Sequence, residues 1–261
     1  MADWLALCRA AADDVRGVLL ELPGRSDREP VVGRGMGGDE TTAIDAAAEG
    51  VILARFAGLD ATIVSEEAGV RGDGKTYVVV DPIDGSLNAK RGIGFFSVSI
   101  AVASGPTMGD VDFGFVHDFG TGEEWTATRG DGARLNGAPL EGQLPKDEIE
   151  ILSFEATRTA AVAEQAAAVV DLAYRLRIMG SLALSLCHLA AGRVDAVCSL
   201  KPARAVDIAA AQLLVRERGL AIDLFDAPPF GAAPLDLEGR SRVVAAGTPE
   251  LCRKLASALS A

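Results

Sequence analysis

The order of hydrophobic and polar positions predicts two helices and then a series of strands in the first half of the chain. Apolar residues recur at helical spacing from Trp4 to Leu19, and a second helical pattern covers residues 41–58. Residues 23–40, which separate them, are rich in glycine and charge and are typical of a loop. Strands are expected where apolar residues alternate or run together, at residues 61–65, 76–80, 95–103, 109–118 and 123–130, with a turn at 71–75 and a hairpin at 131–139.

The pattern changes near residues 141–147, after which strands and helices alternate. Strands are expected at residues 148–154, 174–179, 194–200, 221–225 and 241–247, and helices at 157–171, 181–191, 205–218 and 248–258. A run of strands followed by alternating strands and helices is typical of two differently built lobes. We therefore predict an N-terminal α+β lobe, residues 1–145, and a C-terminal α/β lobe, residues 146–261.

Composition and charge narrow the classes of function. The chain has 261 residues, 49% hydrophobic and 5% aromatic, so its core should be large and aliphatic. A net charge of −12 argues against binding to nucleic acid or to an anionic membrane, which needs a basic face. The N-terminus lacks the basic start of a signal peptide, and no uncharged apolar run is long enough to span a membrane. We expect a cytoplasmic protein whose scattered cysteines, without zinc-binding spacing, are reduced.

Four acidic residues stand at the ends of apolar segments, and they are the candidates for chemistry. Glu66 and Asp81 each follow a predicted strand, Asp84 comes three residues later, and Asp207 opens an apolar helical run. Carboxylates beside apolar segments are costly to bury unless they are paired, and few basic residues lie nearby in the sequence. Oxygen ligands without histidine or cysteine select magnesium, calcium or manganese rather than zinc. Each of these residues also has a plain structural explanation. Asp81 and Asp84 fit a surface turn, Glu66 fits a solvated strand end, and Asp207 fits a charge at a helix N-terminus, so the prediction of a site depends on their joint occurrence.

The segment 81–86 reads DPIDGS, and it combines features of a metal site and of an anion site. Pro82 favours an extended Asp81, and Asp84 is a suitable N-cap for a helix over residues 85–91. The first amides of that helix, those of Gly85 and Ser86, have no intrahelical partner and favour an anion. The segment thus offers two carboxylates and the Ile83 carbonyl to a metal ion, and these amides to an anion. This combination points to metal-assisted hydrolysis of a phosphate ester.

Three stretches resemble the signatures of the inositol monophosphatase superfamily. They read IVSEEAGV at 63–70, DPIDGSLN at 81–88 with GIGFFSVSIAV at 92–102, and DIAAAQLLVRERG at 207–219. Within this superfamily, the chain most resembles the archaeal-type fructose-1,6-bisphosphatase/inositol-1-monophosphatases. Three features carry this resemblance: the serine after DPIDG, the stretch GGDETTAID and the absence of tryptophan before Asp207. The resemblance implies a five-layered α-β-α-β-α sandwich that forms a homodimer. It also implies a magnesium-dependent phosphomonoesterase with two or three ions per site, for which manganese is an alternative.

The resemblance also implies roles for matching residues. The first magnesium ion would be held by Glu66, Asp81 and the Ile83 carbonyl, the second by Asp81, Asp84 and Asp207, and a third, weaker ion by Glu66 with Asp39. Ser86 and Asp45 would orient the attacking water. The Gly85 and Ser86 amides would bind phosphate, and Gly180 and Ser181 would contact the substrate's ring hydroxyls or phosphate.

Some positions depart from the family pattern and affect substrate recognition. Ala89 and Gly94 replace a phenylalanine and a proline, and the aspartate and arginine that usually precede the last motif are missing from residues 199–202. Positive charge could instead come from Lys201 or Arg204, and Arg177 is a candidate for a second phosphate, although it also fits a solvated strand. The glycine-rich segment 31–40 could close over the site and bring in Asp39, or be a merely flexible loop.

The sequence leaves open two alternatives to a sugar or inositol phosphatase. One is a nucleotide phosphatase of the same superfamily, acting on NADP or 3′-phosphoadenosine phosphate, although no aromatic platform for adenine is evident. The other is a metal- or phosphate-binding module without activity, which the complete set of carboxylates disfavours.

Overall fold

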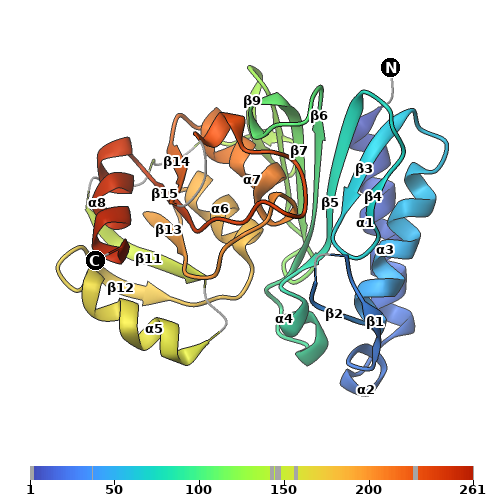
Figure 1. Ribbon diagram of the computed structural model, residues 1–261, viewed down its shortest axis with the longest axis horizontal. Helices are drawn as coiled ribbons and strands as arrows, with labels where there is room; N and C mark the ends of the chain where they lie inside the picture. Colours follow the sequence, from blue (N-terminus) through green and yellow to red (C-terminus); the bar gives the residue numbers. More distant parts are fainter. Residues whose placement is uncertain are drawn as a thin grey trace.

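The computed structural model describes residues 3–36, 38–141, 144, 148–155, 158–225 and 229–260. Figure 1 shows five layers that alternate helices and sheets. The outer layer at the right of the view is formed by α1 (Trp4–Glu21) and α3 (Ala43–Phe56), joined through the short helix α2 (Arg25–Arg28) and the two-stranded ribbon β1 (Val31–Arg34) and β2 (Glu40–Thr42). The predicted five-layered α-β-α-β-α sandwich is thus confirmed.

The first sheet has eight strands in the order β10-β9-β8-β7-β6-β5-β3-β4. It is antiparallel except for the parallel pair of β3 and β5. Its strands are β3 (Ala61–Ser65), β4 (Gly69–Arg71), β5 (Thr76–Asp84), β6 (Ser97–Ala103), β7 (Val111–Asp118), β8 (Glu124–Thr128), β9 (Gly132–Leu135) and β10 (Ala138–Pro139). The short helix α4 (Ser86–Arg91) follows β5 directly.

The second sheet has five strands in the order β12-β11-β13-β15-β14. They are β11 (Ile149–Glu155), β12 (Ala173–Arg177), β13 (Ala196–Ser199), β14 (Ala221–Leu224) and β15 (Val243–Ala246). Two helices, α6 (Leu182–Ala190) and α7 (Ala205–Glu217), form the middle layer between the sheets, whereas α5 (Thr159–Ala166) and α8 (Pro249–Ser260) lie on the opposite face of the second sheet (Figure 1).

The hydrophobic core follows this layering. The largest cluster of buried side chains combines strands of the first sheet with the aliphatic faces of α6 and α7. Close packing there depends on small residues: a Cβ at Gly114 of β7 would lie 2.5 Å from the Ala210 carbonyl oxygen of α7. Because helices from the second half of the chain pack on the sheet of the first half, one continuous core joins the two predicted lobes. The boundary at 145/146 lies outside the described residues and stays a prediction.

Three local predictions were wrong. The glycine-rich segment 23–40 is not only a loop, because Val31–Arg34 pairs with Glu40–Thr42 in an antiparallel ribbon. Arg71, placed in a turn, ends the edge strand β4. Asp84 is not an N-cap, since β5 continues through it and Gly85 occupies the N-cap position of α4. In the last case, strand pairing of Asp84 with Ser97 extends β5 beyond Pro82, which lacks an N–H to donate.

Candidate active site

A cavity of about 330 Å³ receives residues from both halves of the chain. Among the described residues, nine of its lining side chains are acidic: Asp39, Glu40, Asp45, Glu66, Glu67, Asp81, Asp84, Glu155 and Asp207. Three are basic, namely Lys90, Lys201 and Arg204. The cavity therefore gathers all four carboxylates that the sequence singled out, and it carries a large excess of negative charge.

Strand register explains why Glu66 and Asp81 meet. Strands β3 and β5 run parallel, and Ser65 pairs with Val80. The residue after each member of this pair is acidic: Glu66 comes directly after β3, and Asp81 lies within β5. The two carboxylates therefore start from neighbouring positions. Asp81 is only 2% exposed, and its Oδ1 accepts a hydrogen bond from the Ile83 N–H at 3.1 Å. This turn of backbone around Pro82 places Ile83 and Asp84 on the cavity wall as well.

Asp84 links the first sheet to the middle helix α6. Its Oδ2 accepts hydrogen bonds from the Ser181 hydroxyl at 2.5 Å and from the Ala183 N–H at 2.8 Å. Ser181 is the N-cap of α6 and accepts from the Leu184 N–H at 3.2 Å. Both bonds to Asp84 use one oxygen, and within the described residues Oδ1 has no hydrogen-bond donor, so it is available to a ligand in the cavity.

Gly85 is required by the close contact of α4 with the loop before α6. Its φ is +89°, and a Cβ there would lie 3.0 Å from the carbonyl oxygens of Gly180 and Phe95. Gly85 and Ser86 both line the cavity, as does Gly180. The predicted phosphate-binding residues and Gly180 therefore lie on facing segments, one from each half of the chain, whereas Ser181 is buried and does not line the cavity.

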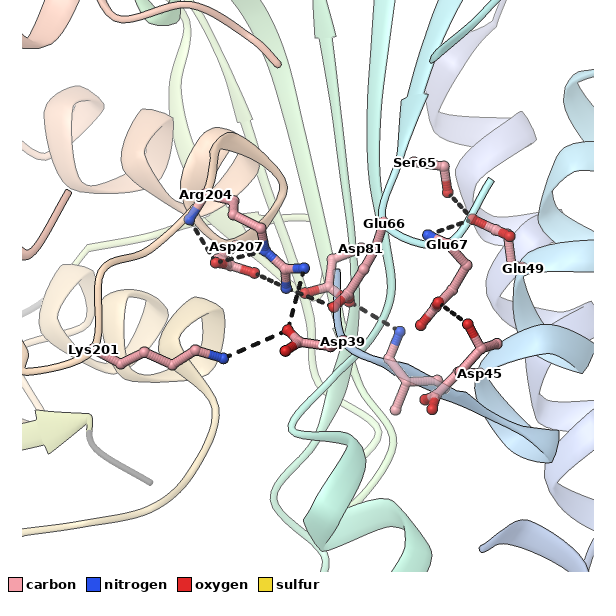
Figure 2. A network of polar contacts seen from close by, with 12 residues as sticks. Asp39, Asp45, Glu49, Ser65, Glu66, Glu67, Asp81, Lys201, Arg204 and Asp207 are labelled. Atoms are coloured by element: carbon pink, nitrogen blue, oxygen red, sulfur yellow. Dashed lines mark hydrogen bonds and ion pairs between the residues drawn. The ribbon is translucent and has the colours of Figure 1, made fainter. Parts of the chain in front are cut away.

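A second network fixes the turn that carries Glu66 (Figure 2). Glu49 of α3 accepts three hydrogen bonds on Oε1, from the Ser65 hydroxyl at 2.5 Å, the Glu67 N–H at 3.1 Å and the Ala68 N–H at 2.9 Å. The ends of the β3–β4 turn are thus held to α3 by one buried carboxylate. The sequence analysis did not single out Glu49, because one glutamate in a helical pattern gives no sign of its partner 16 residues later.

Asp45, the predicted water-orienting residue, is fixed at the start of α3. Its Oδ2 accepts from the N–H and the hydroxyl of Thr42 at 3.2 and 2.5 Å. The neighbouring Thr41 hydroxyl donates to Glu67. Asp45 and Ser86 both line the cavity. The ribbon strand β2 and α3 therefore supply one wall of the site, on the side where Glu66 and Glu67 project.

Arg204 is the main basic group of the site and lies among its carboxylates (Figure 2). Its Nη2 is 2.5 Å from Glu66 Oε1 and 2.9 Å from Asp207 Oδ1, and its backbone N–H donates to Asp207 Oδ2 at 2.7 Å. Asp39 is 3.8 Å from Arg204 Nη1 and 3.8 Å from Lys201 Nζ. The ribbon is thereby connected to the second half of the chain across the cavity mouth.

Three of the proposed metal ligands, Glu66, Asp81 and Asp84, have raised pKa values. Burial raises the pKa of Glu66 to about 7, although the Arg204 guanidinium lowers it. Burial also raises the pKa of Asp84 to about 7, opposed by the hydrogen bond from Ser181. The pKa of Asp81 is raised by burial first and then by the neighbouring carboxylates. One guanidinium does not compensate these charges, so the site needs protons or further cations.

This donor set fits a divalent cation of the magnesium type, since it consists of carboxylates and a carbonyl without histidine or thiol. The arrangement differs from a preformed cage, however. Within the described part of the chain, no three acidic, histidine or cysteine side chains are grouped as they would be around an ion. Between Glu66 and Asp207, where an ion would be held, the structure places the guanidinium of Arg204.

The remaining predicted residues divide into two groups. Lys201 and Arg204 line the cavity, and Asp39 lies at its edge as an exposed residue. Arg177 does not line it: the side chain is exposed on β12 and donates to the Leu176 carbonyl at 2.9 Å. Gly37, part of the segment predicted to close over the site, lies outside the described residues.

The structure adds two residues that sequence reasoning missed. Glu155 ends β11 inside the cavity and accepts hydrogen bonds from Ser185, at 2.6 Å, and from the Gly180 N–H, at 2.9 Å. The signal was available, because Glu155 is a carboxylate at a strand end, as Glu66 is. Lys90 of α4 has no hydrogen bond or ion pair with any other described residue, although it lines the same acidic cavity. Its position depends on the turn at Gly85 and was not readable from spacing.

A five-layered sandwich whose acidic cavity offers carboxylates and a carbonyl to a cation fits a metal-dependent phosphatase. The chain belongs to the inositol monophosphatase family, whose model matches residues 7–261. It is therefore a phosphatase for a small phosphorylated substrate, and this family is metal-dependent.

Known relatives span almost the whole chain. The protein named fructose-1,6-bisphosphatase/inositol-1-monophosphatase from Methanothermobacter thermautotrophicus is 33% identical and covers 98% of this chain and 96% of its own length. A protein named Nus factor SuhB from Pasteurella multocida is 38% identical over 69% of this chain and 70% of its own. A crystal structure of an inositol monophosphatase–fructose 1,6-bisphosphatase superposes with a TM-score of 0.85 at 29% identity, covering 98% of this chain and 100% of that one.

Proposed function

We propose that this protein is a magnesium-dependent phosphomonoesterase that hydrolyses fructose 1,6-bisphosphate, inositol 1-phosphate or both. The observation that carries the proposal is the convergence of Glu66, Asp81, Asp84 and Asp207 in one cavity that also contains the Gly85–Ser86 segment. Relatives with the double name of fructose-1,6-bisphosphatase and inositol-1-monophosphatase support the choice of substrates.

The proposed metal ligands follow from the positions of the carboxylates. Glu66, Asp81 and the Ile83 carbonyl would hold one ion, and Asp81, Asp84 and Asp207 a second. Asp39, with Glu66, is the candidate ligand for a third ion. When bound, magnesium would supply positive charge to the phosphate oxygens and lower the pKa of a water molecule.

The protein's own groups would position water and substrate. The Ser86 hydroxyl and Asp45 line the cavity wall where an attacking water would be held, and Thr42 fixes the rotamer of Asp45 through its Oδ2. The Gly85 and Ser86 amides would bind the phosphate, and Gly180 would contact the remainder of the substrate. Ser181 would act through Asp84, because its hydroxyl is already donated to that carboxylate. Hydrolysis would be a direct in-line displacement without a phosphoenzyme.

A phosphate-release assay tests this proposal. The purified protein is incubated with fructose 1,6-bisphosphate, inositol 1-phosphate, NADP or 3′-phosphoadenosine 5′-phosphate, each with magnesium or with EDTA. We expect release from the first two substrates with magnesium alone. Preferential release from the last two would favour a nucleotide phosphatase instead, and binding of magnesium without release from any substrate would indicate a non-catalytic module.

A variant pair makes the assay specific to the site. Asp84→Asn removes one proposed ligand charge, and Asp73→Asn is a matched control, because Asp73 is exposed on the connection after β4 and does not line the cavity. Full magnesium-dependent activity in Asp84→Asn would overturn the proposed ligand set.

Location and assembly extend the proposal. Within the described residues, no helix has the length and apolarity needed to cross a bilayer. We expect a cytoplasmic homodimer. We also expect no binding to nucleic acid, because the net charge of the chain is −12. Light scattering measures the mass of the particle in solution and so tests the homodimer. A mobility-shift assay tests whether the protein binds RNA, which is relevant because some relatives carry the name Nus factor SuhB.

A further inference from the structure

Arg204 is a buried cation in the position where the proposed metal ligands should converge. Its side chain is 6% exposed, and Nη2 makes hydrogen bonds to Glu66 Oε1 at 2.5 Å and Asp207 Oδ1 at 2.9 Å (Figure 2). Its Nε lies 3.4 Å from Asp207 Oδ2. One guanidinium therefore joins a carboxylate after β3 to one at the start of α7, which come from different halves of the chain.

These contacts use the same oxygens that a cation would need. Both oxygens of Asp207 are engaged by Arg204, Oδ1 through the guanidinium and Oδ2 through the backbone N–H at 2.7 Å. A divalent cation at Asp207 would face a positive charge at hydrogen-bond distance, which is strongly unfavourable in a poorly solvated site. A cation held by Asp207 therefore competes with Arg204 in its present position.

The guanidinium is incompletely paired, and its residue borders a second cavity. Arg204 Nη1 is buried without a hydrogen-bond acceptor, and it lies 3.8 Å from Asp39, whose side chain is 59% exposed. Arg204 also lines a second cavity of about 180 Å³. Its backbone is fixed, because residues 203 and 241 form a β-bridge and Arg204 is the N-cap of α7. Only the guanidinium needs to be displaced.

We propose that Arg204 is a resident counter-ion that neutralises Glu66 and Asp207 when no metal is bound and is displaced by a divalent cation. The displaced guanidinium then binds the phosphate that enters the cavity. Its N–H groups no longer donate to the carboxylates, and their planar arrangement matches two phosphate oxygens. Metal and phosphate therefore bind cooperatively. This inference rests on the proposed function, because it assumes that Glu66 and Asp207 are metal ligands.

Calorimetric titration of magnesium, without substrate, tests the exchange. Arg204→Gln removes the charge and keeps a planar donor, and Arg55→Gln is a matched control that breaks a different arginine–aspartate ion pair, with Asp14 at 2.6 Å, away from the cavity. We expect Arg204→Gln to bind magnesium about tenfold more tightly than the wild type, within the usual range of coupling between two ligands. Its melting temperature in EDTA should fall, and its gain on adding magnesium should exceed that of the wild type. Unchanged or weaker magnesium binding in Arg204→Gln would overturn the exchange.

Inorganic phosphate provides the second arm, and its first measurement uses the wild type alone. In the wild type, phosphate should tighten magnesium binding several-fold, and this effect should be smaller in Arg204→Gln but unchanged in Arg55→Gln. Wild-type magnesium binding that is indifferent to phosphate would overturn the cooperative step. Failure of the proposed function looks different, because then the wild type would not bind magnesium or release phosphate from any ester.

Discussion

The metal-free protein should lose stability as the pH rises, because its site carboxylates are protonated more readily in the folded state than in the unfolded chain. Burial raises the pKa of Glu66 from 4.5 to about 7, and that of Asp84 from 3.8 to about 7. Each shift corresponds to about 3–4 kcal/mol of differential stability. Since the two groups titrate together, we expect a combined loss of several kcal/mol rather than the full sum.

The sign of the effect follows from proton linkage. Between the unfolded and folded pKa values the folded state binds more protons, so the free energy of unfolding falls as the pH rises through this window. The loss is complete only above about pH 7 to 8, where both carboxyls are ionised. Magnesium should reverse the trend, because it binds the ionised carboxylates and therefore stabilises the protein most at high pH.

Urea unfolding in EDTA at pH 5.5 to 8 measures this dependence, and 0.2 M salt screens the general repulsion of a chain with a charge of −12. Asp84→Asn removes one titrating group and should flatten the curve, whereas Asp73→Asn should not. A metal-free stability that is constant or rises from pH 5.5 to 8 would refute the reasoning, because it would mean that these carboxyls are ionised without penalty.

Three further predictions concern activity and packing. Asp84→Asn should lower turnover about a thousandfold, or ~4 kcal/mol, in the magnesium-dependent phosphate-release assay, and activity within threefold of the wild type would contradict the ligand role. Gly85→Ala should destabilise the protein by about 1–3 kcal/mol in urea unfolding, because φ is +89° and a Cβ would contact the Gly180 carbonyl at 3.0 Å; an unchanged midpoint would contradict it. Glu49→Ala should lower the free energy of unfolding by about 2–3 kcal/mol and weaken magnesium binding, because three donors lose their acceptor. Urea unfolding measures the first effect and calorimetry the second, and unaltered values would show that the Glu66 turn does not depend on Glu49.

Much of the fold could be predicted because hydrophobic periodicity is local. The strand from Ala61 to Ser65, the helix from Ala43 and the alternation after Ile149 all follow from side-chain pattern. The ribbon at Val31–Arg34 could not be predicted in this way, because its four residues are exposed and only pairing with residues 40–42 defines it.

The site was predictable where the signal lies in strand ends and failed where it depends on tertiary geometry. Glu66 and Asp81 each follow a short apolar run, which the sequence shows, and the parallel register that pairs Ser65 with Val80 makes them neighbours. The role of Arg204 could not be read from the sequence, because its partner Glu66 is 138 residues away and the contact depends on how α7 meets the first sheet. The N-cap prediction for Asp84 failed for a related reason, since its carboxylate accepts from the Ala183 N–H in the first turn of α6 and not from the helix that follows it.

Binding of manganese, counted per chain by electron paramagnetic resonance in the presence of inorganic phosphate, tests the central claim most directly. The account predicts saturable binding of at least two ions to the wild type and loss of this binding in Asp81→Asn, the variant of the ligand proposed to bridge both ions. Absence of saturable binding to the wild type, or the same stoichiometry and affinity in Asp81→Asn, would contradict it.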